Sequence, residues 1–99
     1  MAFFMVTPSE LRSTASTLRE YNSNFKTQVA ALEAAEGTLN SSWEGPARDT
    51  FHTSFMNDKA YMDAFVAEIE KYCITLEGMA TEYEKAEAAN VETASARRY

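Results

Sequence analysis

The sequence has few of the residues that interrupt helices and close tight turns. Only 3 glycines and 2 prolines occur among its 99 residues. An all-β domain of this length needs a turn signal every ~8–12 residues, so the sequence argues against that class. The length suits one small domain, and 45% hydrophobic with 24% charged residues is typical of a folded chain rather than a disordered one.

Cysteine and histidine are almost absent. Cys73 is the only cysteine, so no intrachain disulfide can form, which fits a chain that folds in a reducing cytoplasm. His52 is the only histidine, and a zinc site needs several ligands at suitable spacing. We therefore expect no metal site, with His52 facing solvent and Cys73 packing at the margin of a helical seam.

Long apolar runs are also missing. The stretch Met1–Val6 is apolar, but it lacks a basic n-region and Thr7–Pro8 ends it before the core of a signal peptide could form. No segment approaches the ~20 apolar residues of a membrane span. We expect a protein made in the cytoplasm, with no cleavable signal peptide and no stable membrane insertion. Export would then not use the general secretory route.

Basic residues are outnumbered by acidic ones. The formal net charge is −6, and ten acidic residues stand against four basic ones between Pro46 and Glu92. A protein that binds nucleic acid would show a basic stripe, and an anionic membrane surface would repel this chain. The charge pattern is typical of a solvated helix face, and we expect no nucleic-acid partner.

Two long helical patterns are present instead. The first opens with Thr7 as N-cap, Pro8 at the first helical position and Glu10 three residues after the cap, the spacing of a capping box. Val6 and Leu11 hold the positions of a hydrophobic staple. This helix is predicted over about residues 8–40. Its apolar residues recur at strict sevens, as in a coiled coil: Leu11, Leu18, Phe25, Leu32 and Leu39.

A turn is predicted at residues 41–46, where serines and Gly45 precede Pro46. Pro46 suits the first position of a second helix. Trp43 is unusual here, because turns favour small polar residues. Its indole either fastens the turn to the helix ends or serves as an exposed anchor for a partner.

The second helix is predicted over about residues 47–92, followed by a frayed tail at residues 93–99 where the period is lost. Asp58 is the one polar step in its pattern. The apolar residues follow four- and three-residue steps: Phe51, Phe55, Met62, Phe65, Ile69, Tyr72, Leu76, Met79 and Tyr83. Two long helices joined by a short turn must lie antiparallel. We therefore predict one all-α helical hairpin over residues 1–99.

A single hairpin would leave many of these large side chains half exposed. Fully burying one such side chain is worth about 1.5–3 kcal/mol. The simplest remedy is a second hairpin, which gives a four-helix bundle by dimerisation. The apolar positions of both helices then form the core and dimer seam; a looser monomer is the alternative.

No constellation of catalytic residues is apparent. The chain has no EF-hand loop and no Gly-rich phosphate loop, and paired carboxylates would need a pocket for acid–base chemistry. We predict no enzyme and no cofactor, and interpret the chain as an interaction protein. Tyr83 and Glu87 stand at i and i+4 near the end of the second helix. Taken alone, they are a seam residue and a surface charge.

The chain resembles the small Trp-x-Gly proteins of the early secreted antigenic target family, which are substrates of type VII (ESX-type) secretion. The resemblance covers essentially the whole chain. It rests on Trp43-Glu44-Gly45 at the predicted turn and on the length of the hairpin. The stretch from Tyr83 to Glu87 is similar to the family's Tyr-x-x-x-Asp/Glu export motif.

The resemblance implies a head-to-tail dimer, formed with itself or with a related hairpin of similar length. It also implies recognition by a membrane-bound FtsK/SpoIIIE-type secretion ATPase. Trp43 and Gly45 of one subunit would join Tyr83 and Glu87 of the other in a bipartite export signal. The protein would act as a secreted effector or co-secreted helper.

Three other functions stay open at this point. A cytosolic adaptor could pair with the helical targeting domain of a larger secreted toxin. A membrane-active protein is suggested by the apolar stretch at Phe3–Val6, but the acidic surface opposes it. A hidden enzymatic role fits least, for want of any catalytic constellation.

Overall fold

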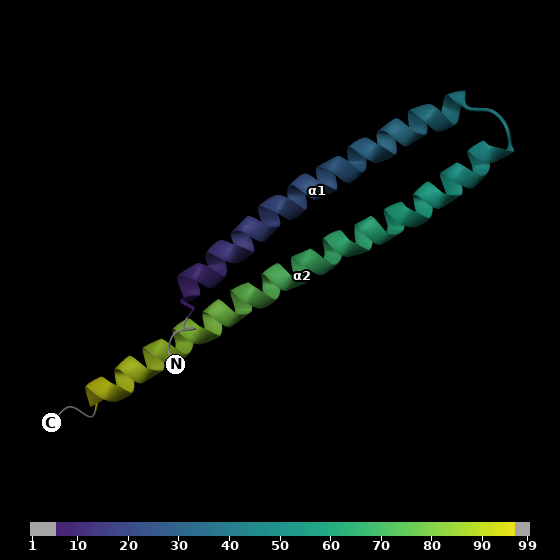
Figure 1. Cartoon of the computed structure of the whole chain (residues 1–99). Helices are drawn as coiled ribbons and strands as arrows, with labels where there is room; N and C mark the ends of the chain where they lie inside the picture. The colour runs from purple at the N-terminus through teal and green to yellow at the C-terminus, as the bar shows by residue number, and fades with distance from the viewer. Residues whose placement is uncertain (1–5, 97–99) are drawn as a thin grey trace.

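The protein is a thin rod made of two antiparallel helices. A computed structural model describes residues 6–96 of the chain. Helix α1 spans Pro8–Ser42 and helix α2 spans Pro46–Ala96, and they lie side by side along their length (Figure 1). The rod measures 85 × 22 × 16 Å. The predicted all-α antiparallel hairpin is thus confirmed, in a molecule too thin for any residue to be far from the surface.

Helix α1 begins at the predicted capping box. The Thr7 hydroxyl oxygen accepts a hydrogen bond from the backbone N–H of Glu10 at 3.0 Å, and the Glu10 carboxylate accepts one from the N–H of Thr7 at 3.0 Å. These bonds to Thr7 lower the pKa of Glu10. Pro8 follows at the start of the helix, where its missing N–H costs nothing. The local sequence therefore fixes this end of the rod.

The turn between the helices consists of Trp43, Glu44 and Gly45. Trp43 leaves the helix with extended backbone angles, and Gly45 has a φ of +112°, which L side chains rarely adopt. The Gly45 carbonyl accepts a hydrogen bond from the N–H of Arg48 at 3.1 Å and so opens α2. The half-buried Trp43 ring lies 5.6 Å from the Phe51 ring, centroid to centroid. The indole thus folds back onto the first turns of α2.

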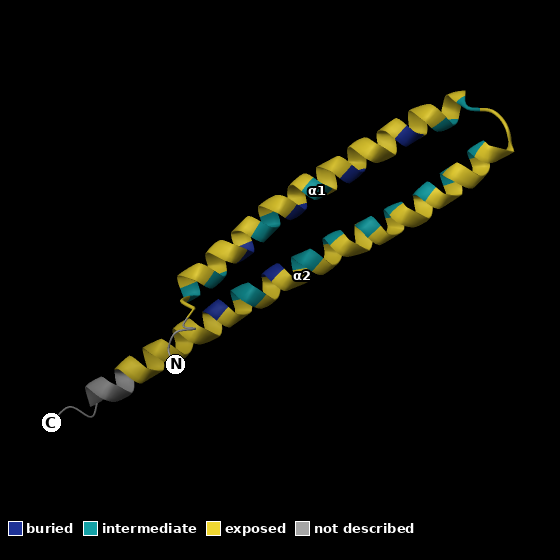
Figure 2. Cartoon of the chain, viewed as in Figure 1, coloured by how far each residue is buried: buried dark blue, intermediate teal, exposed yellow. Residues whose placement is uncertain are grey.

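The line of closest approach between the helices runs through a different stripe from the one predicted. On α1 the buried residues recur every seven positions and have small or polar side chains, and the two that α2 buries completely, Cys73 and Ala80, have the same spacing (Figure 2). The buried α1 residues are Ala15, Asn22, Val29 and Glu36. Small side chains at the contact allow two helix backbones to approach, and bulky ones are displaced to its edge.

The residues predicted for the seam therefore divide into two groups. One group is partly buried between the helices: Leu11, Leu18, Phe25, Phe55, Met62, Ile69 and Leu76. The other group is exposed and does not form the core of the hairpin, which corrects the sequence-based expectation for a single chain: Leu32, Leu39, Phe51, Phe65, Tyr72, Met79 and Tyr83.

Helix α2 is 51 residues long and α1 is 35, so the C-terminal part of α2 extends beyond the start of α1 (Figure 1). The helix continues to Ala96, although the apolar period ends near Glu92. Loss of the period removes packing, but backbone hydrogen bonds can still propagate through residues with good helix propensity such as Ala94 and Ala96. Residues 97–99 of the predicted tail lie outside the described part. Between residues 6 and 96, neither helix contains a stretch apolar and long enough to cross a membrane.

Candidate interaction surface

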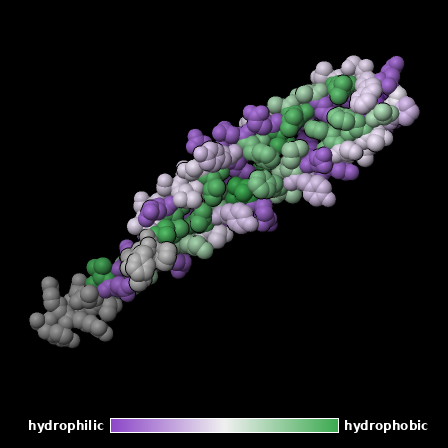
Figure 3. All heavy atoms as spheres, in the orientation of Figure 1, coloured by the Kyte–Doolittle hydropathy of each residue, from purple (hydrophilic) through white to green (hydrophobic). Residues whose placement is uncertain are grey.

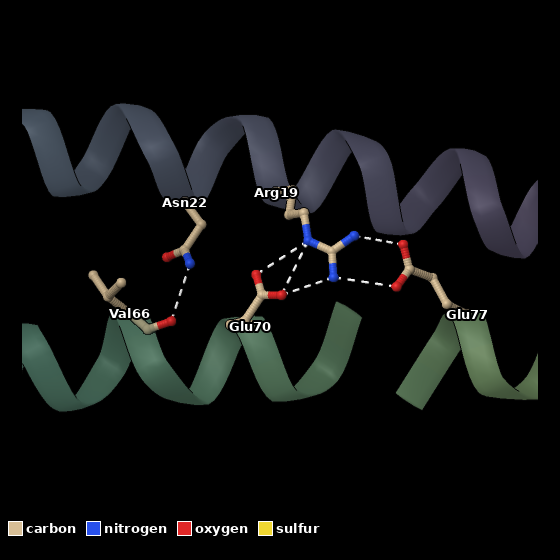
Figure 4. Close-up of polar contacts among 5 residues, drawn as sticks. All are labelled: Arg19, Asn22, Val66, Glu70 and Glu77. Carbon is tan, nitrogen blue, oxygen red and sulfur yellow. Dashed lines mark hydrogen bonds and ion pairs between the residues drawn. The ribbon is translucent and has the colours of Figure 1, made fainter. Parts of the chain in front are cut away.

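One long side of the hairpin carries polar contacts that join the two helices. Arg19 of α1 reaches two glutamates of α2, and its guanidinium lies between their carboxylates (Figure 4). It donates to Glu70 at 2.7 Å and 3.1 Å and to Glu77 at 3.1 Å. The hydrogen bonds raise the pKa of Arg19 and lower the pKa of both carboxyl groups. The pairing of these three residues is a contact that the sequence analysis did not find.

Asn22 adds a second polar link near the middle of the rod. Its side-chain N–H donates to the backbone carbonyl of Val66 at 3.0 Å, as Figure 4 shows. The amide oxygen of the same side chain is buried and has no hydrogen-bond partner among residues 6–96. A buried polar residue at a seam position disfavours other alignments of two helices. Asn22 therefore favours this alignment of α1 with α2 over others.

The end of the hairpin near the turn has its own ionisable pair. Glu36 is buried, and its carboxylate lies 2.8 Å from Nδ1 of His52. His52 is half-buried rather than solvent-facing, so that expectation was wrong. It was wrong because His52 belongs to the same seven-residue series as the fully buried Cys73, whereas the sequence pattern placed the seam one position away. Cys73 is a packing residue, as expected, but it is fully buried between the helices rather than at the margin of the seam.

The opposite long side is an apolar face that spans both helices. We define this apolar face by its exposed large side chains: Tyr21, Leu32, Leu39, Phe51, Phe65, Tyr72, Met79 and Tyr83. Apolar atoms gather along the length of the rod in the space-filling view (Figure 3). Near the middle, the ring of Phe65 meets that of Phe25 edge-on, with centroids 5.6 Å apart and planes at 75°. Exposed large apolar side chains gathered on one side of a molecule are typical of an interface with another protein.

Three shallow grooves lie along this face. The open-end groove, of about 790 Å³, is lined by Val6, Leu11, Gly78, Met79, Glu82, Tyr83 and Ala86. The central groove is lined by Leu18, Tyr21, Asn22, Phe25, Phe65 and Ile69. The closed-end groove, next to the turn, is lined by Leu32, Ala35, Glu36, Leu39, Phe51 and Phe55. Their linings contain few charged groups, which suits apolar side chains of a partner rather than a polar small molecule.

The four residues expected to form an export signal lie at opposite ends of the molecule. Trp43 and Gly45 are in the turn, whereas Tyr83 and Glu87 belong to the part of α2 near the open end of the hairpin, where Tyr83 lines a groove together with Leu11 of α1. Tyr83 is 49% exposed and lines the open-end groove. One chain therefore does not bring the two halves together. Gly78 lines the same groove.

Among the described residues, no group of three or more His, Cys, Asp or Glu side chains is arranged to hold a metal ion. Several charged side chains of the polar side form pairs between or along the helices. Lys59 is an example, because it donates to Asp63 at 2.7 Å and lies 3.8 Å from Glu33. The contacts on this side stabilise the two helices and hold them together.

The fold and its surface define a class of protein. It is a small two-helix hairpin in which polar contacts join the helices on one side and apolar side chains are exposed on the other. The chain belongs to the WXG100 family, described as proteins of 100 residues with WXG, which matches residues 4–88. Trp43 and Gly45 supply the Trp and Gly of that pattern at the turn.

Solved structures of similar fold include EsxB, a secreted protein of Bacillus anthracis strain Sterne. The wild-type protein superposes with a TM-score of 0.75 at 24% identity, over 84% of this chain and 89% of that chain. The selenomethionine-labelled form gives a TM-score of 0.77 at 23% identity, over 88% and 99%. At this identity the likeness concerns the fold. No curated protein sequence matches the chain.

Proposed function

We propose that this protein is a non-enzymatic substrate of a type VII (ESX-type) secretion system, exported as a folded dimer. The observation that carries the proposal is the apolar face, which runs the length of a hairpin of the WXG100 family and is uncovered in a single chain. Members of this family are generally non-enzymatic secreted proteins. After export the dimer acts as an effector or co-secreted helper.

A head-to-tail dimer would also explain why the two halves of the export motif are far apart in one chain. If two hairpins pack their apolar faces in opposite directions, the turn of each lies beside the open end of the other. Trp43 and Gly45 of one subunit then adjoin Tyr83 and Glu87 of its partner. A membrane-bound FtsK/SpoIIIE-type ATPase that binds this composite surface would select folded dimers.

The export signal is tested by secretion of variants from the natural host. Tyr83→Ala and Trp43→Arg are expected to remain in the cell, because each removes one half of the composite surface. Tyr61→Ala is the matched control, since Tyr61 is 77% exposed on α2 and outside the motif. Circular dichroism of purified variants checks that the helices persist. Export of Tyr83→Ala and Trp43→Arg at the level of the wild-type protein would exclude the bipartite signal.

The same apolar face would serve a cytosolic adaptor that pairs with the helical domain of a larger toxin. Light scattering after size-exclusion chromatography separates the two functions. A mass near twice the 11.1 kDa of the chain favours the exported dimer. A monomer mass, with a stable complex formed only when a larger helical protein is added, favours the adaptor.

A further inference from the structure

The part of α2 that follows Gly78 has little packing of its own against α1. Ala80 is buried, but every residue from 81 to 91 is exposed. Most of the stability of a helix in a protein comes from packing of one of its faces. We call residues 79–91, which contain both C-terminal export-motif residues, the motif segment. Because packing covers so little of it, the motif segment needs another contact to stay in place.

One side chain of α1 supplies such a contact. Arg12, in the second turn of α1, forms an ion pair with Glu84 and donates a hydrogen bond to the Thr81 hydroxyl at 3.3 Å. The Thr81 hydroxyl in turn donates to the backbone carbonyl of Glu77 at 3.1 Å. Between residues 6 and 96, Glu84 is the last residue of α2 that a hydrogen bond or ion pair joins to α1. Arg12 is therefore the outermost polar link between the helices at the open end.

A weak point of α2 separates this link from the next one along the rod. Arg19 pairs with Glu70 and Glu77, which precede Gly78, whereas Arg12 pairs with residues that follow it. Glycine inside a helix is unfavourable relative to alanine, so α2 opens more easily at Gly78 than at its neighbours. The motif segment can therefore detach while the rest of the hairpin stays closed, unless the contact with Arg12 holds it.

The same contact sets the rotation of the motif segment about its own axis. Leu11 and Tyr83 both line the open-end groove. Their neighbours in sequence, Arg12 and Glu84, form the ion pair. Adjacent residues of an α-helix lie about 100° apart around its axis, so the groove and the ion pair constrain the segment from different directions. Tyr83 and Glu87 share one face of the helix as i and i+4, so this orientation applies to both.

We propose that Arg12 is a positioning residue for the export motif: its ion pair with Glu84 keeps the motif segment helical against α1 and presents both motif residues on one face. This inference rests on the proposed function. It adds a residue of α1, far from the motif in sequence, on which the motif depends. Export machinery that binds the helical form meets a competent fraction set by this ion pair, and its apparent affinity falls in proportion to that fraction.

The position of the ion pair explains why a modest contact has a large effect. The side chains of Arg12 and Glu84 are 44% and 52% exposed, and an exposed ion pair contributes little to the stability of a whole protein. The ends of helices, however, open with free energies close to zero. A severalfold change in the opening equilibrium there moves the ordered fraction substantially, whereas the same change in the middle of the rod would go unnoticed.

Reversing the charge of Arg12 tests the contact. Arg12→Glu is expected to speed hydrogen exchange of the amides of residues 83–90 about threefold or more, because two like charges replace an ion pair. Lys26→Glu is the matched control, since Lys26 is exposed on the same helix and its reversal changes the net charge equally. The double variant Arg12→Glu/Glu84→Arg restores the pair in reverse and should exchange like the wild-type protein. Equal exchange in Arg12→Glu and Lys26→Glu, or no recovery in the double variant, would overturn the proposal.

The weak point is tested by Gly78→Ala in the Arg12→Glu chain. A Cβ at Gly78 meets nothing within 4 Å, so the substitution adds helix propensity without a clash. It is expected to slow exchange of residues 83–90 about threefold. Gly37→Ala in the same chain is the control, because it makes the same change in α1, where a Cβ also meets nothing within 4 Å, and should leave these amides unchanged. Equal effects of the two alanines would overturn the assignment of Gly78 as the point where the motif segment opens.

Export from the natural host separates this inference from the proposed function. Arg12→Glu is expected to lower the exported amount about twofold or more, and the double variant with Glu84→Arg to restore it. Export of Arg12→Glu at the wild-type level, while Tyr83→Ala stays in the cell, would overturn the positioning role and leave the proposed function standing. Export of both single variants at the wild-type level would exclude the C-terminal half of the export signal as well.

Discussion

At the scale of single residues, the hairpin depends on a few polar contacts at or near its seam. Glu36 is the clearest case, because its carboxylate is buried and its one described polar partner is His52. A carboxylate that keeps its burial but loses its partner is more costly than an exposed charge. Stability near the turn should therefore depend on the imidazole.

Replacing His52 by alanine is expected to destabilise the protein by about 1–3 kcal/mol at neutral pH, since it leaves the Glu36 carboxylate buried without a partner. Urea unfolding followed by circular dichroism measures the change. Lys71→Ala serves as control, because Lys71 is exposed and forms a surface ion pair with Glu68 at 3.6 Å. This substitution should shift stability by less than about 0.5 kcal/mol. An equal effect of both substitutions would show that the pair is not stabilising.

The ion pairs of Arg19 with Glu70 and Glu77, called the Arg19 clamp below, predict how the free energy of unfolding responds to acid. Arg19 holds the pKa values of Glu70 and Glu77 below the ordinary value of 4.5. Because the folded-state pKa values are lowered, the clamp contributes fully above pH 4.5 and its contribution is lost as the pH falls below that value, through the lowered pKa values. Arg19→Met removes the clamp. The difference in unfolding free energy between wild type and Arg19→Met should shrink as the pH falls from about 6 to about 3; a constant difference would contradict this assignment.

At the scale of elements, the turn is set by the backbone of one residue. Gly45 is needed for its φ of +112° and not for space, since a Cβ there would meet nothing within 4 Å. Gly37 lies inside α1 with the same open surroundings but an ordinary helical backbone. Both glycines have space for a side chain, but only Gly45 has a backbone conformation that disfavours one.

Gly45→Ala is expected to lower the unfolding free energy by about 1–2 kcal/mol, because an L side chain is unfavourable at positive φ. Gly37→Ala should raise it by up to about 1 kcal/mol, through better helix propensity. Thermal unfolding of the two variants beside the wild-type protein gives the comparison. A loss of stability in Gly37→Ala, or none in Gly45→Ala, would be inconsistent with this account of the turn.

At the scale of the whole molecule, the uncovered apolar face implies that folding and association are linked. A dimer of two hairpins would have a melting temperature that rises with protein concentration, because association stabilises the folded state. The polar side, with its paired charges, would then remain toward solvent. The thinness of the rod, at 16 Å in its shortest extent, gives a single chain little core of its own.

A charge on the apolar face should separate the subunits. Leu32→Glu is expected to give a monomer by light scattering, because Leu32 is 51% exposed in one chain but would be desolvated in a dimer. Ala30→Glu is the control, since Ala30 is exposed on the same helix and lines none of the three grooves. A dimer in Leu32→Glu as strong as that of the wild-type protein would mean that another surface mediates association.

Much of the hairpin was predictable because its signals are local. The capping box depends on Thr7 and Glu10 alone, and the turn depends on a few consecutive residues. Both can therefore be predicted from short stretches of sequence. The seven-residue spacing likewise tells which side chains share one stripe of a helix. The spacing could not show which of the adjacent seven-residue series on each helix lies against the other helix. The small size of Ala15, Cys73 and Ala80 was the available signal.

The sequence alone determined two long helices, an antiparallel hairpin and the residues at the turn, because each follows from contacts between near neighbours. The tertiary structure decided which apolar residues the single chain covers, that Arg19 meets two glutamates of the other helix, and that Leu11 and Tyr83 line one groove. These depend on how closely two distant segments approach. That distance is set by the smallest side chains on both helices together, and neither helix specifies it by itself.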